Sequence, residues 1–225
     1  MKIGIFGTGV AGRTLAEKLA ADGNEVMIGT RDVAATLQKG QDASGKQSYQ
    51  AWQEEHPSVK LATFADTAKF GEIIFIVTYG NAAIAAIDLA DVNSFTDKVV
   101  IDTTNPLDIS KGIPPLFTAT PGNSLGEQIQ QHLPRAKVVK AFNTLGMPII
   151  VNPQRAEGDP VLLIAGNDES AKKVVSSIAK SWGWKDVVDY GDIGESFYLE
   201  AFAMLWIRYA FNHKSWTHAF SFLRK

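Results

Sequence analysis

The chain begins with the stretch Lys2-Ile3-Gly4-Ile5-Phe6-Gly7-Thr8-Gly9-Val10-Ala11-Gly12. Its first residues form a short apolar run that is typical of a buried strand, and the residues from Val10 onward have the apolar spacing of a helix. The glycines at the junction make a GxGxxG pattern, which is informative only when a strand precedes it and a helix follows it. Because both are expected here, the stretch predicts the first strand–turn–helix unit of a parallel α/β sheet.

Each glycine of this turn has a separate physical role. Gly7 permits the tight turn, Gly9 allows the backbone to approach a pyrophosphate, and Gly12 lets the helix pack closely on the sheet. The helix N-terminus offers unpaired N–H groups and a partial positive charge to phosphates. A turn without any ligand is the alternative, but the strand and helix favour a dinucleotide. The candidate cofactor-binding residues are therefore Gly7, Thr8, Gly9, Val10, Ala11 and Gly12.

The rest of the chain repeats the strand–helix alternation. Further strands are expected at 25–29, 59–63, 72–77, 98–102 and 136–141, with helices at 81–89 and 123–133, the second capped by Asn123. Such alternation predicts a Rossmann-type, doubly wound parallel sheet over residues 1–150. Residues 32–58 and 107–122 are expected to be irregular, with Gly40 and Gly45 as breakers and a short helix near 49–55. Residues 147–160 are expected to be a linker.

Residues 151–225 are expected to add further strand and helix units and a small helical part. The pattern predicts a strand at 161–165, a helix at 168–182 and an edge strand at 186–188. From Glu195 onward only helical patterns occur, and residues 195–225 hold nine of the 22 aromatic residues. One helical face is expected to carry Leu199, Phe202, Leu205, Trp206 and Tyr209. These helices are expected to cover the end of the sheet, and also to form a homodimer interface or one wall of an acceptor pocket.

The end of the second strand bears on the choice between NAD and NADP. An NAD-selective site places an acidic residue there, to accept hydrogen bonds from the ribose hydroxyls. This chain instead has Thr30 and Arg31, and an arginine can pair with a 2′-phosphate and stack beside the adenine. The competing interpretation is an NAD site in which Asp32 contacts the ribose, although Asp32 falls a residue or two late. Lys39 is expected to be an ordinary solvated lysine.

Three more segments follow strands, where ligands of doubly wound sheets bind. They are Thr78-Tyr79-Gly80-Asn81, Thr103-Thr104-Asn105-Pro106 and Phe142-Asn143-Thr144. Their hydroxyl and amide groups suit contacts with nicotinamide, ribose and a planar acceptor. The alternative is that Asn105-Pro106 forms only a turn and Asn143 only a cap.

Composition excludes several classes of site. The chain has no cysteine, which excludes disulfides, thiolate metal sites and a cysteine nucleophile. A formal net charge of -2 gives no reason to expect a nucleic-acid or membrane partner. No apolar run approaches the length of a membrane span, and no export signal is visible, so a cytoplasmic protein is expected.

The four histidines are not arranged for catalysis or metal binding. His56, His132, His213 and His218 all lie away from the predicted strand ends, so we expect no metal site. No catalytic side chain is expected either, since a dinucleotide supplies the hydride and direct transfer to a second redox ring needs no side-chain acid or base. This argues against an alcohol or 2-hydroxy-acid dehydrogenase, which must protonate an alkoxide.

Several segments together resemble the coenzyme F420-dependent NADP oxidoreductase family over nearly the whole chain. They are the glycine turn, Gly29-Thr30-Arg31, Lys140-Ala141-Phe142-Asn143-Thr144, Tyr198-Leu199-Glu200 and Leu205-Trp206-Ile207. The resemblance implies a Rossmann domain with a small C-terminal helical part, commonly dimeric, that transfers hydride between NADPH and the deazaflavin F420. It maps the 2′-phosphate contact onto Thr30 and Arg31. It maps the nicotinamide-side loops onto Thr78-Tyr79, Asn105-Pro106 and Ala141-Phe142-Asn143.

The segment Tyr79-Gly80-Asn81 departs from the bulky Pro-Trp-like stretch of the archaeal members of that family. The expected function is therefore an NADP(H)-dependent oxidoreductase with a flat acceptor, either F420 or a flavin-like ring. The alternative is a non-catalytic dinucleotide sensor whose C-terminal region binds a partner, since fold alone does not decide function.

Overall fold

The computed structural model describes residues 1–40 and 47–224. Its centre is an eight-stranded sheet in the order β10-β9-β8-β5-β4-β1-β2-β3. The strands are β1 (Lys2–Phe6), β2 (Glu25–Thr30), β3 (Lys60–Thr63), β4 (Ile73–Ile76), β5 (Val99–Asp102), β8 (Lys137–Ala141), β9 (Val161–Gly166) and β10 (Asp186–Asp189). Strand β1 lies between β2 and β4, and all three are parallel. The chain order therefore reverses direction beside β1, which is where ligands of doubly wound folds bind.

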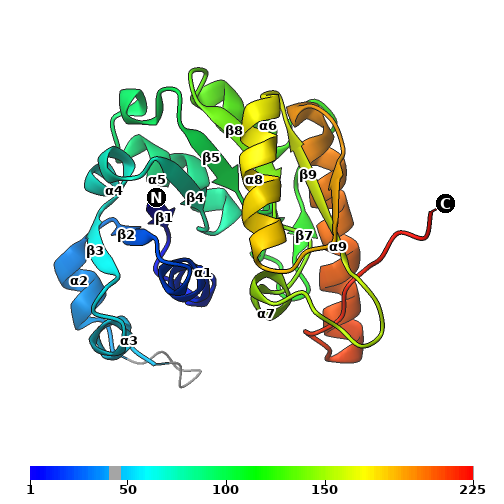
Figure 1. Cartoon of the computed structure of the whole chain (residues 1–225), viewed down its shortest axis with the longest axis horizontal. Helices are drawn as coiled ribbons and strands as arrows, with labels where there is room; N and C mark the ends of the chain where they lie inside the picture. Colours follow the sequence, from blue (N-terminus) through cyan, green and yellow to red (C-terminus); the bar gives the residue numbers. More distant parts are fainter. Residues whose placement is uncertain (41–46, 225) are drawn as a thin grey trace.

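Helices cover both faces of the sheet (Figure 1). They are α1 (Val10–Ala21), α2 (Val33–Gln38), α3 (Tyr49–Glu55), α4 (Phe64–Phe70), α5 (Ala83–Asp88), α6 (Leu125–His132), α7 (Met147–Val151), α8 (Glu169–Ser181) and α9 (Ser196–His213). Three single turns, η1 (Gly80–Ala82), η2 (Val92–Phe95) and η3 (Ile193–Glu195), complete the helical part. This arrangement confirms the predicted Rossmann-type fold with a small C-terminal helical part.

Alternate residues of each strand enter different cores, as the two-residue period of a strand requires. Ile3, Ile5 and Ile28 join the core cluster that α1, α3, α7 and α8 also enter. Ile74 and Ile76 belong to the cluster on the opposite face, together with residues of α4, α5 and α6. Strands with apolar residues on both faces are buried between two helical layers, which explains the uninterrupted apolar run in β4.

The sheet departs from a fully parallel arrangement at one point. Strand β9 runs antiparallel to β8, with Lys140 opposite Ala165, and β10 is again parallel to β9. Strand β10 lies at the edge, as predicted for residues 186–188. The residues between β8 and β9 contain α7 rather than a plain linker, and this short helix with Pro148 near its start packs beside α1.

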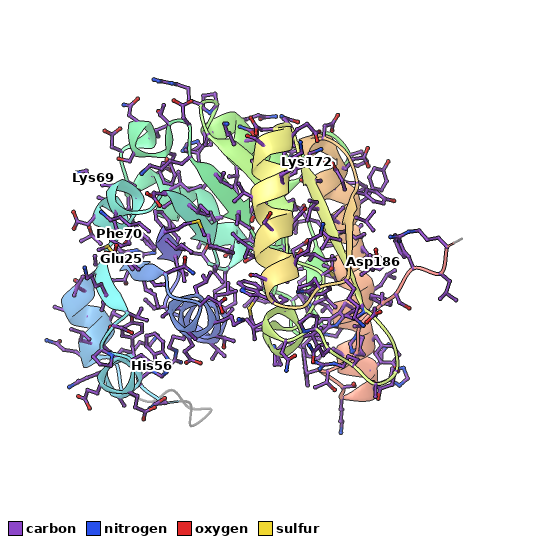
Figure 2. All side chains as sticks on the ribbon, in the orientation of Figure 1. Glu25, His56, Lys69, Phe70, Lys172 and Asp186 are labelled. Atoms are coloured by element: carbon purple, nitrogen blue, oxygen red, sulfur yellow. The ribbon has the colours of Figure 1, made fainter. Side chains whose placement is uncertain are left out.

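The C-terminal region contains one helix rather than several. Helix α9 ends at His213, where Lys214 adopts a left-handed conformation with φ of 51°. Residues 216–224 have no helix, and the carbonyl of Phe220 accepts from the backbone N–H of Val161 beside β9. Asp186 lies near this tail in Figure 2 and accepts a 3.1 Å hydrogen bond from Arg224. A backbone hydrogen bond to the first residue of β9 and the contact with Asp186 therefore hold this segment against the sheet.

Other local predictions need correction. Helix α2 occupies part of the stretch expected to be irregular, whereas Gly45 lies outside the described residues. The expected loop after β5 holds a small hairpin of β6 (Leu107–Asp108) and β7 (Leu116–Phe117). Helix α6 is capped by Ser124, not Asn123, because Ser124 and Glu127 form a reciprocal capping box. Within residues 1–40 and 47–224, no helix is long and apolar enough to cross a membrane.

Candidate functional site: the loops at the carboxyl edge of the sheet

The glycine turn joins β1 to α1 at the carboxyl edge of the sheet. Gly7 has φ of +137°, a conformation that L-residues rarely adopt, and its N–H donates to the carbonyl of Gly29. A Cβ at Gly7 would lie 2.8 Å from the carbonyl oxygen of Val77, at the end of β4. The turn therefore fits against both neighbouring strands only because residue 7 has no side chain.

The other two glycines differ from each other in what surrounds them. A Cβ at Gly12 would lie 2.0 Å from the carbonyl oxygen of Gly7, so the helix packs directly against the turn. A Cβ at Gly9 would have no heavy atom within 4 Å. Gly9 is also the N-cap of α1 and provides no side-chain cap. The N-terminus of this twelve-residue helix is thus unobstructed at Gly9 and has no side-chain acceptor at its cap, which is the arrangement that binds phosphate.

The residues after β2 divide into a capping residue and an exposed cation. The Asp32 carboxylate accepts a 2.9 Å hydrogen bond from the N–H of Ala35 and caps α2. Thr30 is buried, with its hydroxyl 2.7 Å from that of Thr36. Arg31 between them is exposed. Because the Asp32 carboxylate already has a structural role, the exposed cation is the better placed of the two for a ribose substituent.

The three other predicted strand-end loops meet one another. Asn105 and Asn143 are joined by two hydrogen bonds: Asn105 Nδ2 donates to the backbone carbonyl of Asn143 at 2.8 Å, and Asn143 Nδ2 donates to Asn105 Oδ1 at 2.9 Å. A Cβ at Gly80 would lie 2.0 Å from the carbonyl oxygen of Asn105. The loops after β4, β5 and β8 are therefore in direct contact. Tyr79, beside them, has 82% of its surface exposed.

Two buried polar atoms in these loops, Thr78 Oγ1 and Asn143 Oδ1, have no hydrogen-bond partner among the described residues. Such atoms are rare in folded proteins and concentrate where function requires them. The Asn143 amide cannot be reversed, because its Nδ2 also donates to the carbonyl of Leu199 at 3.1 Å. The polar loops, the open N-terminus of α1 and the exposed Arg31 all lie at the carboxyl edge, so the residues present fit a dinucleotide.

The sequence predicts Phe142 and its neighbours at the cofactor site, but in the structure the Phe142 side chain is buried. Phe142 is buried and packs on Trp182, with ring centroids 5.4 Å apart, so its side chain belongs to the core. Its φ of 60° turns the chain out of β8. Ala141 and Pro106 are also buried. Ligand contacts by Phe142 would have to come from its backbone, and Asn143 supplies the polar side chain of this loop.

A buried ionic cluster beside these loops was not found by sequence reasoning. The Lys140 Nζ lies 2.8 Å from Asp102 Oδ2, 2.7 Å from Glu200 Oε1 and 2.6 Å from the carbonyl oxygen of Thr104. All three charged side chains have no exposed surface. Burial alone would lower the pKa of Lys140, but the carboxylates of Asp102 and Glu200 together raise that pKa above its ordinary value. The only sequence signal was a lysine that follows two valines within a strand.

Helix α9 also differs from the sequence-based expectation. Leu199 and Trp206 are buried, but Leu205 and Tyr209 have 59% and 45% of their surfaces exposed, so the predicted apolar face does not pack as a unit. Phe197 at the start of α9 contacts Phe117 of the hairpin, with ring centroids 5.9 Å apart. In residues 1–40 and 47–224, no group of three or more metal-ligating side chains is placed to hold a metal ion.

Comparisons with known proteins show what this chain is similar to. Residues 2–106 match the family described as NADP oxidoreductase, coenzyme F420-dependent. A crystal structure from Arthrobacter sp. FB24, described as a candidate F420-dependent NADP reductase, is 41% identical, with a TM-score of 0.94 and full coverage of both chains. The F420-dependent NADP reductase of Methanocaldococcus jannaschii is 29% identical over 96% of this chain and 95% of its own. The rat metalloreductase STEAP3 is 26% identical over 89% of this chain, which spans only 36% of that relative.

Proposed function

Because this chain belongs to the coenzyme F420-dependent NADP oxidoreductase family and is an NADP-dependent oxidoreductase, we propose that it transfers hydride between NADPH and a flat redox ring. F420 is the first candidate for that ring, and a flavin is the second. The observation that carries the proposal is the open N-terminus of α1 at Gly9, with the exposed cation Arg31 at the neighbouring strand end.

Each part of the cleft has a role in binding. The N–H groups at the start of α1 hold the pyrophosphate, and Thr30 with Arg31 holds the 2′-phosphate. The Asn105–Asn143 pair, together with Thr78, borders the nicotinamide. When bound, NADPH would supply a hydride to the acceptor ring, and the accompanying proton would come from bulk solvent outside the two rings. The protein's contribution is to orient the two rings and exclude water from between them.

The acceptor is best identified by NADPH oxidation against a panel of F420, FMN, FAD and ferric chelates. We expect F420 to give the highest kcat/KM, since the archaeal relative is named for that acceptor. Ferric chelates enter the panel because the rat relative is named a metalloreductase. If FMN or a ferric chelate is reduced faster than F420, that compound is the preferred acceptor. The proposal that NADPH donates the hydride or electrons would still hold.

A non-catalytic dinucleotide sensor is the competing function. It predicts tight NADPH binding with no acceptor reduced above the rate without enzyme. That result, obtained with protein that binds NADPH stoichiometrically, would reject the oxidoreductase proposal.

We also propose a homodimer formed through α9. Tyr198, Leu205 and Tyr209 are exposed along one side of this helix and are spaced seven and four residues apart. Light scattering after size-exclusion chromatography should give a mass near twice 24.4 kDa. Leu205→Glu should shift that mass to the monomer, whereas Leu89→Glu, at an exposed leucine elsewhere, should not. A monomeric wild type would reject this assembly.

A further inference from the structure

Glu200 joins helix α9 to two other elements. Its Oε2 accepts from the N–H of Leu125 at 3.1 Å, and its Oε1 accepts from the N–H of Gly126 at 3.0 Å. The carboxylate therefore binds the first N–H groups of α6, where a negative charge is favoured. The same Oε1 accepts from Lys140 Nζ at 2.7 Å. A single buried carboxylate thus connects α9 with α6 and with the end of β8.

Lys140 extends this connection to the loop after β5. Its Nζ donates to the carbonyl of Thr104 and to Asp102 Oδ2. The other oxygen of Asp102 accepts from the N–H of Thr104 at 2.9 Å and from its hydroxyl at 2.6 Å. Thr104 is therefore held through its carbonyl, its N–H and its side chain. It directly precedes Asn105, which borders the proposed nicotinamide site.

A second connection runs from α9 through neutral groups. The carbonyl of Leu199, the residue before Glu200, accepts from Asn143 Nδ2, and Asn143 in turn donates to Asn105. Asn105 contacts Gly80 so closely that no Cβ would fit between them. Two consecutive residues of α9 therefore hold all three loops at the nicotinamide end of the cleft.

We propose that Glu200 is a positioning residue for hydride transfer: its buried contacts with Lys140 and with α6 fix α9, which sets the loops after β5 and β8 around the nicotinamide. This inference rests on the proposed function, because it places the nicotinamide at those loops. It assigns no chemical step to Glu200, which lies behind the loops and touches neither ring. The glycine turn and Arg31 belong to the other half of the cleft, around β1 and β2, and have no bond to this network among the described residues.

The two halves of the cleft allow the proposal to be tested selectively. Glu200→Gln keeps the size of the side chain but removes the negative charge and one acceptor. Binding of 2′,5′-ADP, which fills only the adenosine half, should change by less than about twofold, because the hydrogen bonds of Glu200 go to Leu125, Gly126 and Lys140 and not to that half. The single-turnover rate of NADPH oxidation should fall about 10- to 100-fold, because small misplacement of reacting groups has effects of that size. Glu169→Gln, at a carboxylate on α8 that is 73% exposed and pairs with Lys172, is the matched control and should leave both values unchanged.

A readout without an acceptor separates this proposal from the proposed function. NADPH fluorescence in the binary complex reports the surroundings of the nicotinamide and needs no acceptor. If wild-type protein reduces nothing, the proposed function fails, and the Glu200 proposal is then judged by whether Glu200→Gln alters that emission. The proposal is overturned if folded Glu200→Gln shows wild-type NADPH fluorescence and a wild-type rate of NADPH oxidation. It is also overturned if the variant loses 2′,5′-ADP affinity by the same factor as it loses rate.

Asn143→Ala is the second variant, for the case that Glu200→Gln does not fold. It removes the link from Leu199 to Asn105 but leaves the Lys140–Glu200 contact in place. We expect the same signature, with 2′,5′-ADP binding retained and hydride transfer reduced. A folded Asn143→Ala protein with wild-type hydride transfer would overturn the proposal.

Discussion

The Lys140 Nζ lies 2.7 Å from Glu200 Oε1, and neither side chain has any exposed surface. The partners come from β8 and α9, 60 residues apart in the chain. With Asp102 the cluster carries one positive and two negative charges, and the N–H groups of Leu125 and Gly126 offset the excess. Buried charges of this kind are tolerable only while each keeps its partners.

Lys140→Met should therefore destabilise the protein strongly. The substitution keeps much of the apolar stem but leaves Asp102 and Glu200 buried with no cation between them. Removing one partner from a buried ionic cluster costs about 3–5 kcal/mol of unfolding free energy. Urea denaturation followed by circular dichroism measures this loss.

Lys172→Met is the matched control. Lys172 pairs with Glu169 and Asp189, whose side chains are 73% and 45% exposed and remain hydrated without it. The control should lose about 1 kcal/mol or less. Equal losses of unfolding free energy in the two variants would show that burial does not increase the contribution of the Lys140 cluster to stability.

The parts of the fold that sequence reasoning placed correctly depend on neighbours along the chain. The turn at Gly7, the helix that follows it and the apolar strand β4 are recognised from residue type and period within a few positions. The carboxyl ends of parallel strands then meet by topology, which is why Asn105 and Asn143 were expected at one site before their contact was known.

The parts that were missed depend on contacts between distant segments. No local pattern pairs Lys140 with Glu200, and none reverses β9 relative to β8. Helix α9 is apolar on several sides, so its period could not distinguish the buried Leu199 from the exposed Leu205. The sequence also does not show that the Phe142 ring packs in the core on Trp182, so its predicted cofactor contact remains a prediction for its backbone.

Arg31→Ala should raise the Kd for NADPH about 10- to 100-fold and leave the Kd for NADH nearly unchanged. A hydrogen bond to a charged group is worth about 1.5–3 kcal/mol, and NADH lacks the 2′-phosphate that would receive it. Fluorescence titration with both nucleotides measures the effect. Lys39→Ala removes the next cation along the chain and should not discriminate between them. Equal weakening of NADPH and NADH by Arg31→Ala would reject the 2′-phosphate assignment.

Acid stability should depend on Asp168, the N-cap of α8. Hydrogen bonds from the Ser170 hydroxyl and the Ala171 N–H lower its pKa from 3.8 to about 2. A depressed carboxyl pKa gives stability that is complete above the ordinary value and is lost as the pH falls from 3.8 towards about 2. Asp168→Asn should therefore melt below wild type at pH 7, and the difference should shrink through this window.

Ser170→Ala tests the cause of that pKa shift. The carboxylate stays, but its first donor is lost, so its pKa should rise towards 3.8, and the fall in melting temperature should be smaller and should end at a higher pH than in wild type. A melting difference between wild type and Asp168→Asn that stays constant from pH 7 to pH 2 would contradict this account of the α8 cap.

Gly9→Val and Gly12→Ala should affect different properties of the protein. Gly9→Val should lose NADPH binding, whereas Gly12→Ala should lose stability. Gly9 has φ of -70°, and a Cβ there meets no atom within 4 Å, so Gly9→Val should keep the unfolding free energy within about 0.5 kcal/mol. Its side chain would occupy the open space that we propose for the pyrophosphate, so NADPH binding should be lost. Gly12→Ala forces a methyl group to 2.0 Å from the Gly7 carbonyl oxygen and should cost about 1–3 kcal/mol by overpacking. Thermal melts and NADPH titration of both variants separate the two roles, and a stable Gly9→Val protein that still binds NADPH would place the pyrophosphate elsewhere.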